Sequence, residues 1–185
     1  MQRTQLIMKR IIYYVVLAGM VLSGCEKDTC GCLEDQPVLF EYRYINFAWG
    51  TQDHGWLIDD KGIVRAFNLP DDFRLPDSTG FISRRDLVHN LSLTDSTMGV
   101  VEPDELNFYA DLIPGAAEGE IGESQNIAAD AGSAVFSCYL YDQDADAYRY
   151  VFLAQSGDWE QFNLSGEAGI LVDWLLDFGV FWLSE

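Results

Sequence analysis

Hydrophobic and polar side chains alternate along the stretch that follows Pro37, which is the pattern of a β-strand with one buried face. Up to Tyr44 the apolar positions have even numbers, and from Ile45 onward they have odd numbers. This change predicts a bulge or bend near Tyr44 that moves the buried face to the other side of the strand. The positions are Val38, Phe40, Tyr42 and Tyr44 before the change, and Ile45, Phe47 and Trp49 after it.

Two β-hairpins are predicted further along the chain. Residues 56–58 and 63–67 are mostly apolar, and the turn between them ends in Gly62, which can supply the positive φ that closes a hairpin. Residues 134–141 and 148–155 are rich in aromatic and β-branched side chains and predict the second hairpin. Residues 70–80, with prolines and aspartates, predict an acidic loop.

Three helices are indicated by capping residues and by apolar positions at helical spacing. Ser83 can cap a short helix, and Pro103 can begin a second helix that Pro114-Gly115 ends. Ser165 can cap a third helix near the C-terminus. This last helix has one continuous apolar stripe, which we expect to pack on the sheet: Ile170, Leu171, Trp174, Leu175 and Phe178.

The predicted order of elements is β-β-β-α-α-β-β-α, which corresponds to an α+β fold. Its antiparallel sheet would consist of the two hairpins and the N-terminal strand, packed against two or three helices that include the C-terminal amphipathic helix. Hydrophobic residues make up 49% of the chain and aromatic residues 14%, so the composition is that of a folded protein. Residues 38–185 have the length of one globular domain.

The N-terminal segment has the layout of a secretion signal. Arg3, Lys9 and Arg10 supply positive charge, and an apolar stretch of about a dozen residues follows them and ends at Leu22. A permanent membrane-spanning helix needs roughly 20 apolar residues, so this stretch is short for a retained anchor. We therefore expect residues 1–24 to be a signal peptide that is removed.

Leu22-Ser23-Gly24-Cys25 resembles the lipobox of bacterial lipoproteins. The resemblance implies that the sulfur of Cys25 is diacylglycerylated, that the chain is cut before this residue, and that acyl chains hold it on a membrane. Residues 25–37 would then be the lipidated cysteine and a flexible tether. Glu26-Lys27-Asp28 resembles the surface-export tract of Bacteroidota lipoproteins. These resemblances imply an outer-membrane, lipid-anchored protein on the periplasmic or the cell-surface side.

The layout of the remaining chain also resembles uncharacterised outer-membrane lipoproteins of Bacteroidota. The shared features are an aromatic strand, a glycine-containing hairpin and a C-terminal helix that contains tryptophan. This resemblance implies no particular activity.

The balance of charges restricts the possible partners. The chain has 11 Lys and Arg against 30 Asp and Glu, a formal net charge of −19, and the charged residues of the expected signal peptide are all basic. Nucleic acid and anionic lipid surfaces would repel such a protein. The expected partners are the membrane itself, through the N-terminal acyl chains, and a glycan or a protein of the envelope; nucleic acid is not expected.

Three cysteines remain after Cys25, and an odd number leaves at least one thiol free or paired outside the chain. Cys30 and Cys32 are separated by one residue, so a disulfide between them would be strained, and a bridge from either one to Cys138 is geometrically easier. Free thiols are the equally open alternative. Metal binding fits less well, because a single Cys-x-Cys and two histidines do not make a zinc quartet.

One acidic turn has the spacing with which a calcium loop begins. Asp142, Asp144 and Asp146 alternate as in an EF-hand, but Ala147 stands where that loop has glycine and Leu153 where it has a bidentate glutamate. A solvated hairpin turn explains the same acids, so these residues are a weak calcium candidate. We expect no metal and no cofactor.

Catalytic motifs are absent from the sequence. His54 and His89 are the two side chains suited to proton transfer near neutrality, and neither lies in a recognisable motif. The chain has no nucleophile elbow, zinc-protease helix or phosphate-binding loop. We therefore expect no enzyme and name no catalytic residue.

A few surface positions are candidates for binding or modification. Trp159 is the tryptophan that we expect in a loop, where its ring could contact a ligand such as a glycan. Asp77-Ser78-Thr79 and Asp95-Ser96-Thr97 resemble the O-glycosylation motif of exported Bacteroidota proteins, which implies modification at Ser78 and Ser96 in predicted loops. The function expected from the sequence is a membrane-tethered, non-enzymatic binding or interaction module; the alternative is a small cell-envelope hydrolase with an unrecognised site.

Overall fold

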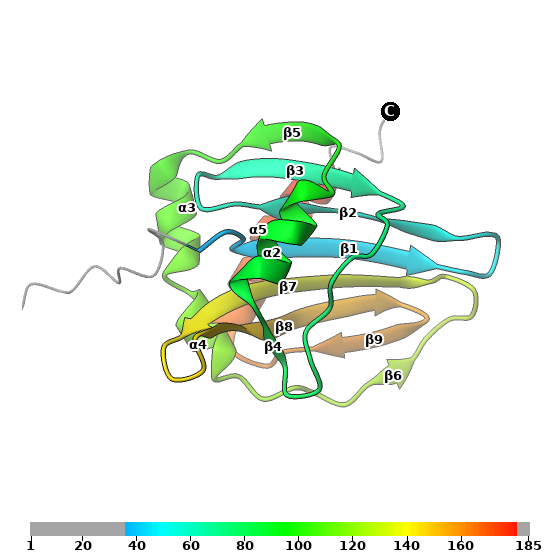
Figure 1. Cartoon of the computed structure of the whole chain (residues 1–185). Helices are drawn as coiled ribbons and strands as arrows, with labels where there is room; N and C mark the ends of the chain where they lie inside the picture. Colours follow the sequence, from blue (N-terminus) through cyan, green and yellow to red (C-terminus); the bar gives the residue numbers. More distant parts are fainter. Residues whose placement is uncertain (1–35, 181–185) are drawn as a thin grey trace, which may run out of the picture. The chain divides into compact units, whose positions relative to one another are not determined.

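The computed structural model describes residues 36–180, and these form an α+β unit built on one open antiparallel sheet (Figure 1). The sheet order is β5-β3-β2-β1-β7-β8-β9-β6, and β4 pairs separately with β8. The strands are β1 (Phe40–Asn46), β2 (Gln52–Ile58), β3 (Ile63–Asn68), β4 (Phe81–Ile82), β5 (Ser96–Val100), β6 (Gln125–Asn126), β7 (Ser133–Asp142), β8 (Ala147–Gly157) and β9 (Trp159–Phe162). The helices are α2 (Arg84–Ser92), α3 (Pro103–Ala110), α4 (Ile113–Ala117) and α5 (Gly166–Val180).

Strand β1 is the central element of the sheet, because it pairs with one strand of each hairpin. Phe40 lies opposite Ile58 of β2 on one side and opposite Cys138 of β7 on the other. The hairpin of β2 and β3 and the hairpin of β7 and β8 are far apart in the sequence, and β1 joins them into one sheet. A strand in this position has hydrogen-bonded neighbours on both edges.

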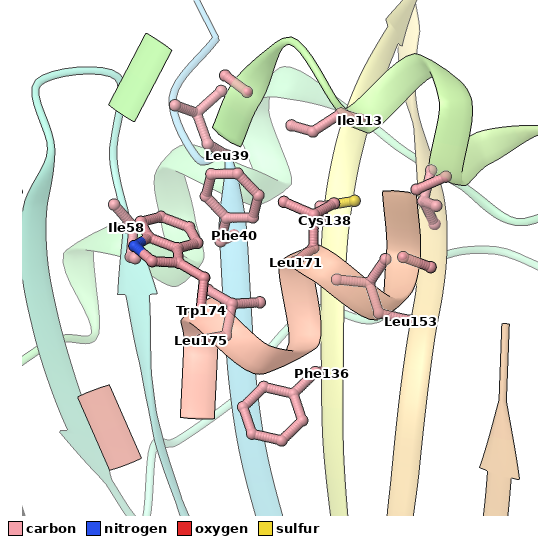
Figure 2. Packing of buried hydrophobic residues seen from close by; sticks show 14 of the residues in the cluster. Leu39, Phe40, Ile58, Ile113, Phe136, Cys138, Leu153, Leu171, Trp174 and Leu175 are labelled. Atoms are coloured by element: carbon pink, nitrogen blue, oxygen red, sulfur yellow. The ribbon is translucent and has the colours of Figure 1, made fainter. Parts of the chain in front are cut away.

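One face of the sheet is covered by α5, with α3 and α4 at its margin. Leu171, Trp174 and Leu175 of α5 point toward Phe40 and Phe136 of the sheet, as Figure 2 shows. We call this set the α5-side core. Its buried members also include Leu39, Ile58, Ile113, Cys138 and Leu153.

The opposite face has a smaller core beneath α2, which crosses the strands on that side (Figure 1). We call it the α2-side core. It consists of Val38, Leu57, Phe67, Ile82, Leu87, Tyr139 and Tyr148, with Phe73, Leu91 and Tyr150 packed against it. This core covers only part of the face, and the remainder carries polar side chains of β1 and β7.

The main sequence predictions of structure are confirmed. Both hairpins are present, and Gly62 has the positive φ of 75° that the first turn requires. Ser83 caps α2 by accepting a hydrogen bond from the backbone N–H of Asp86. Ser165 Oγ accepts one from the backbone N–H of Ala168 at the start of α5. The C-terminal helix packs on the sheet as expected.

Two predictions about apolar faces are wrong. Strand β1 keeps its register through Asn46 and has no bulge near Tyr44; Phe40 lies in the α5-side core, whereas Val38, which precedes the strand, lies in the α2-side core. The irregularities in register occur elsewhere, in β3–β5 and β7–β8. Phe47 and Trp49 are 72% and 81% exposed, because β1 ends before them. Ile170 is 49% exposed, so it lies outside the buried stripe of α5.

Other differences concern the ends and the number of elements. Pro114 does not end the second helix; α3 stops at Ala110, and Pro114 occupies the first turn of the separate helix α4, where its missing N–H is harmless. The short strands β4, β5, β6 and β9 were not predicted. They have at most five residues, so their alternation is too brief to distinguish them from loops.

Candidate functional site

A cavity of about 150 Å³ lies on the face of the sheet that α2 partly covers. Its floor consists of side chains from β1, β7 and β8, and residues 73–76 of the acidic loop form one wall. The floor residues are Glu41, Arg43 and Ile45 of β1, Ser133, Val135 and Tyr139 of β7, and Tyr150 of β8. We call it the Glu41–Arg43 cavity.

The alternation of β1 places charged residues in this cavity. Phe40 and Tyr42 face the α5-side core, so the residues between and after them, Glu41, Arg43 and Ile45, face the opposite side. In the sequence pattern these polar positions belong to the face of the strand that is expected to be exposed. Residues 73–76 of the loop and the tyrosines of β7 and β8 pack on this face and partly enclose Glu41 and Arg43.

Glu41 is an almost fully buried carboxylate, 6% exposed. The hydroxyl of Tyr139 donates a hydrogen bond to its Oε2 at 2.5 Å, and no other described residue donates to this carboxylate. Burial raises the pKa of Glu41 above its ordinary value of 4.5, while the hydrogen bond from Tyr139 and the charge of Arg43 act in the opposite direction. Its second oxygen, Oε1, accepts no hydrogen bond from a described residue and remains available as an acceptor at the cavity.

Arg43 is held by two strong interactions, and its side chain is 13% exposed. Nε and Nη2 donate to the two carboxylate oxygens of Asp53 on β2 at 2.8 and 2.6 Å, which is the bidentate geometry that arginine favours. The ring of Phe73 lies 4.3 Å from the guanidinium carbon. The remaining nitrogen, Nη1, is buried and has no hydrogen-bond partner.

Two tyrosines complete the polar floor. Tyr139 is 1% exposed, and burial together with the adjacent Glu41 raises the pKa of its hydroxyl well above the ordinary value. Burial and the charge of Glu41 likewise raise the pKa of Tyr150. Both hydroxyls therefore stay protonated at any physiological pH and can donate hydrogen bonds.

Asn90 of α2 holds the loop wall at Arg74. The side-chain amide of Asn90 donates to the backbone carbonyl of Arg74, and its oxygen accepts from the backbone N–H of the same residue, each at 2.8 Å. Phe73 packs on Phe67, with their ring centres 5.0 Å apart. The neighbouring loop residue Leu75 is 66% exposed, so the cavity reaches the surface beside it.

The two histidines lie away from this cavity. His54 is exposed, and its ring packs against that of Tyr44 at 5.0 Å. His89 is on α2, where Nε2 lies 3.2 Å from the backbone oxygen and 3.9 Å from Oδ2 of Asp72. Neither histidine lines the cavity.

The acidic residues of the calcium candidate are engaged in the turn between β7 and β8. Oδ1 of Asp142 accepts hydrogen bonds from the backbone N–H groups of Asp144 and Ala145, and Asp146 accepts one from the hydroxyl of Tyr141. Within residues 36–180, no group of three or more His, Cys, Asp or Glu is placed to hold a metal ion.

Two of the predicted surface positions are in strands. Trp159 begins β9 and is 47% exposed, so it is not in a loop, although its ring remains partly accessible. Ser96 begins β5 and is exposed, again not in a loop. Ser78 does lie in a turn, between Asp77 and Gly80.

Cys138 is a free and fully buried thiol in the α5-side core, and burial raises its pKa well above the ordinary value. The predicted bridge from it to Cys30 or Cys32, and the predicted lipidation at Cys25, involve residues outside the described part of the chain. Those two predictions remain predictions.

No protein-family model, no curated protein and no solved structure matches the chain. Among the helices of residues 36–180, none is long and apolar enough to cross a membrane.

Proposed function

We propose that the chain is a lipid-anchored protein of the bacterial cell envelope whose folded unit is a non-enzymatic binding module. The lipobox at residues 22–25 supports the anchor on the outer membrane, and residues 25–37 would serve as the tether. In this proposal the Glu41–Arg43 cavity is the binding site, on either the periplasmic or the cell-surface side.

The observation that carries this proposal is an ionisable pair, Glu41 and Arg43, at the floor of a cavity that reaches the surface. Burying charged groups is unfavourable unless they are fully paired, and a hydrophobic replacement is often more stable. The bidentate contact with Asp53 accounts for the charge of Arg43, but it leaves Nη1 without a partner. A buried carboxylate with a shifted pKa beside a cavity indicates a binding site.

A variant that fills the cavity tests this proposal. Val135 lines the floor, so Val135→Phe places a larger side chain in the space that a ligand needs. Val100→Phe is the matched control, because Val100 is 64% exposed on the edge strand β5, away from the cavity. The full chain in mild detergent would be screened against small envelope metabolites and saccharides by thermal shift.

We expect at least one compound to raise the melting temperature of the parent protein and of Val100→Phe but not of Val135→Phe. Compounds that stabilise all three proteins equally would place binding elsewhere and contradict the proposal. Hydrolysis of a compound by the parent protein would contradict the non-enzymatic part.

A further inference from the structure

Two polar side-chain atoms at the Glu41–Arg43 cavity have no hydrogen-bond partner among the described residues, and they have opposite hydrogen-bonding character. Oε1 of Glu41 is an acceptor, because Tyr139 uses only Oε2. Nη1 of Arg43 is a donor, because Asp53 uses only Nε and Nη2. A buried donor without a partner, such as Nη1, is unfavourable, so a ligand that accepts a hydrogen bond from it would recover that loss.

We propose that the cavity binds a small zwitterion, a molecule that carries an ammonium group and a carboxylate group on one compact apolar body. The proposal rests on the proposed function, since it names the ligand class of the same cavity. The ammonium group would donate to Oε1 of Glu41. The carboxylate would accept from Nη1 of Arg43.

The spacing of the two residues suits such a molecule. Glu41 and Arg43 are two positions apart on one face of β1, so their backbones are separated by about 7 Å. In an α-amino acid the ammonium and carboxylate are on the same carbon, and a hydrogen bond of about 2.8 Å on each side spans a gap of this order.

The charges near the cavity also match a neutral molecule with separated charges. Arg43 is paired with Asp53, and Arg74 of the loop is paired with Asp72 at 2.6 Å. Glu41 has no ion-pair partner among the described residues that line the cavity, so an ammonium group would stabilise its ionised form there. A carboxylate alone would add a second negative charge next to Glu41, which is unfavourable.

The apolar part of the ligand has a defined place and size. Ile45, Val135, Leu75 and Pro76 form the apolar lining. A cavity of about 150 Å³ is below the usual range for drug-sized ligands, about 300–1,000 Å³, and suits a side chain of a few carbon atoms. Phe73 also lines the cavity, with its ring centre 4.3 Å from the guanidinium carbon of Arg43.

Three matched probes test the inference. Leucine has both charged groups, isopentylamine lacks the carboxylate, and 4-methylpentanoate lacks the ammonium group, while all three share one branched apolar body. Binding to the full chain in mild detergent would be followed by the NMR methyl signals of Ile45 and Val135, which line the cavity. We expect leucine to shift these signals and to bind at least tenfold more tightly than either truncated probe.

A variant of Glu41 provides the second arm of the test. Glu41→Gln keeps the shape and an acceptor for Tyr139 but removes the charge, so leucine affinity should fall at least tenfold. Glu120→Gln is the control, because Glu120 is exposed and outside the cavity. The melting temperature of each variant shows whether it is folded. Affinity of the parent should also fall at acidic pH, because protonation of Glu41 removes the charge that attracts the ammonium group. The other ionisable side chains around Glu41 are Arg43, Asp53, Tyr139, Tyr150 and Arg74.

The possible outcomes are separable. Tighter binding of isopentylamine would make the site one for cations, tighter binding of 4-methylpentanoate would make it one for anions, and equal binding of all three would make it an apolar pocket. Each of these results would contradict the proposal of a zwitterionic ligand but would agree with the proposed binding module. If none of the three probes shifts the cavity methyl signals, the proposal of a zwitterionic ligand is also contradicted. The screen with Val135→Phe would then decide whether the cavity binds any compound.

Discussion

Glu41 makes the stability of this fold depend on pH, because burial raises the pKa of its carboxyl group. Below its ordinary pKa of 4.5 the carboxyl group is protonated in the folded and in the unfolded chain. As the pH rises, the unfolded chain releases this proton first, because burial raises the pKa in the folded state. The folded state then binds more protons than the unfolded state, so this residue lowers the free energy of unfolding as the pH increases.

Glu41→Gln should remove this dependence. We expect the stability of the variant relative to the parent to increase between about pH 4 and pH 7, because glutamine does not ionise. Denaturant unfolding of both proteins at the two pH values measures the difference. Glu120→Gln is the control, since Glu120 is exposed and its replacement should leave the difference unchanged. A relative stability of Glu41→Gln that is the same at both pH values would contradict the proton linkage.

Cys25 is the residue on which the proposed location depends. Cys25→Ser should prevent lipidation and leave uncut precursor, because no other cysteine of the chain follows a lipobox. Labelling cells with a fatty-acid probe, followed by mass measurement of the purified protein, tests this. Cys138→Ala is a suitable control for the loss of a thiol, since Cys138 is buried in the sheet. A Cys25→Ser protein that still carries the label would disprove the lipid anchor at this position.

At the scale of elements, α5 depends on Trp174. This residue is 5% exposed, its ring stacks on that of Tyr109 at 4.0 Å, and it lies edge-on to Phe40 at 5.1 Å. Its Nε1 also donates to the carboxylate of Glu105 at 2.8 Å. The side chain therefore connects α5 to both α3 and the centre of the sheet.

Trp174→Ala should lower the free energy of unfolding by about 3–5 kcal/mol, through lost burial and a residual cavity. Leu176→Ala is the control on the same helix, because Leu176 is 45% exposed and its loss should change stability by about 0.5 kcal/mol or less. Denaturant unfolding provides the measurement. If Trp174→Ala melted like the parent and lost only a binding partner, the stripe of α5 would be an interface.

The sequence predicts individual elements well where the information is local. The turn at Gly62, the cap at Ser83 and the apolar spacing of α5 each depend on a few adjacent residues, and all are present. The exposure of Ile170 was not predictable in this way, because it depends on how far the sheet extends beneath the helix. The short edge strand β5 was missed because its residues have no apolar alternation.

At the scale of the whole sheet, the candidate site depends on strand order. The pairing of β1 with β7 joins residues more than 90 positions apart, such as Phe40 and Cys138. Nothing in the local pattern indicates this pairing, and without it β1 is an ordinary strand with one polar face. Glu41 and Arg43 are enclosed by β7, β8 and the loop of residues 73–76, which are distant in the sequence, so the cavity could not be predicted from the sequence.

The junction between β1 and β2 should therefore control both stability and the cavity, and Gly55 is its most restricted residue. Gly55 lies opposite Arg43, and a Cβ there would be 2.0 Å from the backbone oxygen of Tyr42 and 2.9 Å from Cζ of Phe67. The backbone atom cannot move without separating the two strands. Gly55→Ala should therefore destabilise the fold by about 3 kcal/mol or more, the upper end for overpacking.

Gly99→Ala is the matched control, because Gly99 is also in a strand but a Cβ there has no atom within 4 Å. Its stability should rise by up to about 1 kcal/mol, since alanine restricts the unfolded chain more than glycine does. Denaturant unfolding of both variants gives the comparison, and the methyl signals of Ile45 and Val135 report on the cavity. Separation of β1 from β2 would also pull Asp53 away from Arg43, so Gly55→Ala should shift these signals while Gly99→Ala leaves them in place. Equal stability of the two variants would mean that the sheet adapts at this junction and that β1 does not hold the cavity in shape.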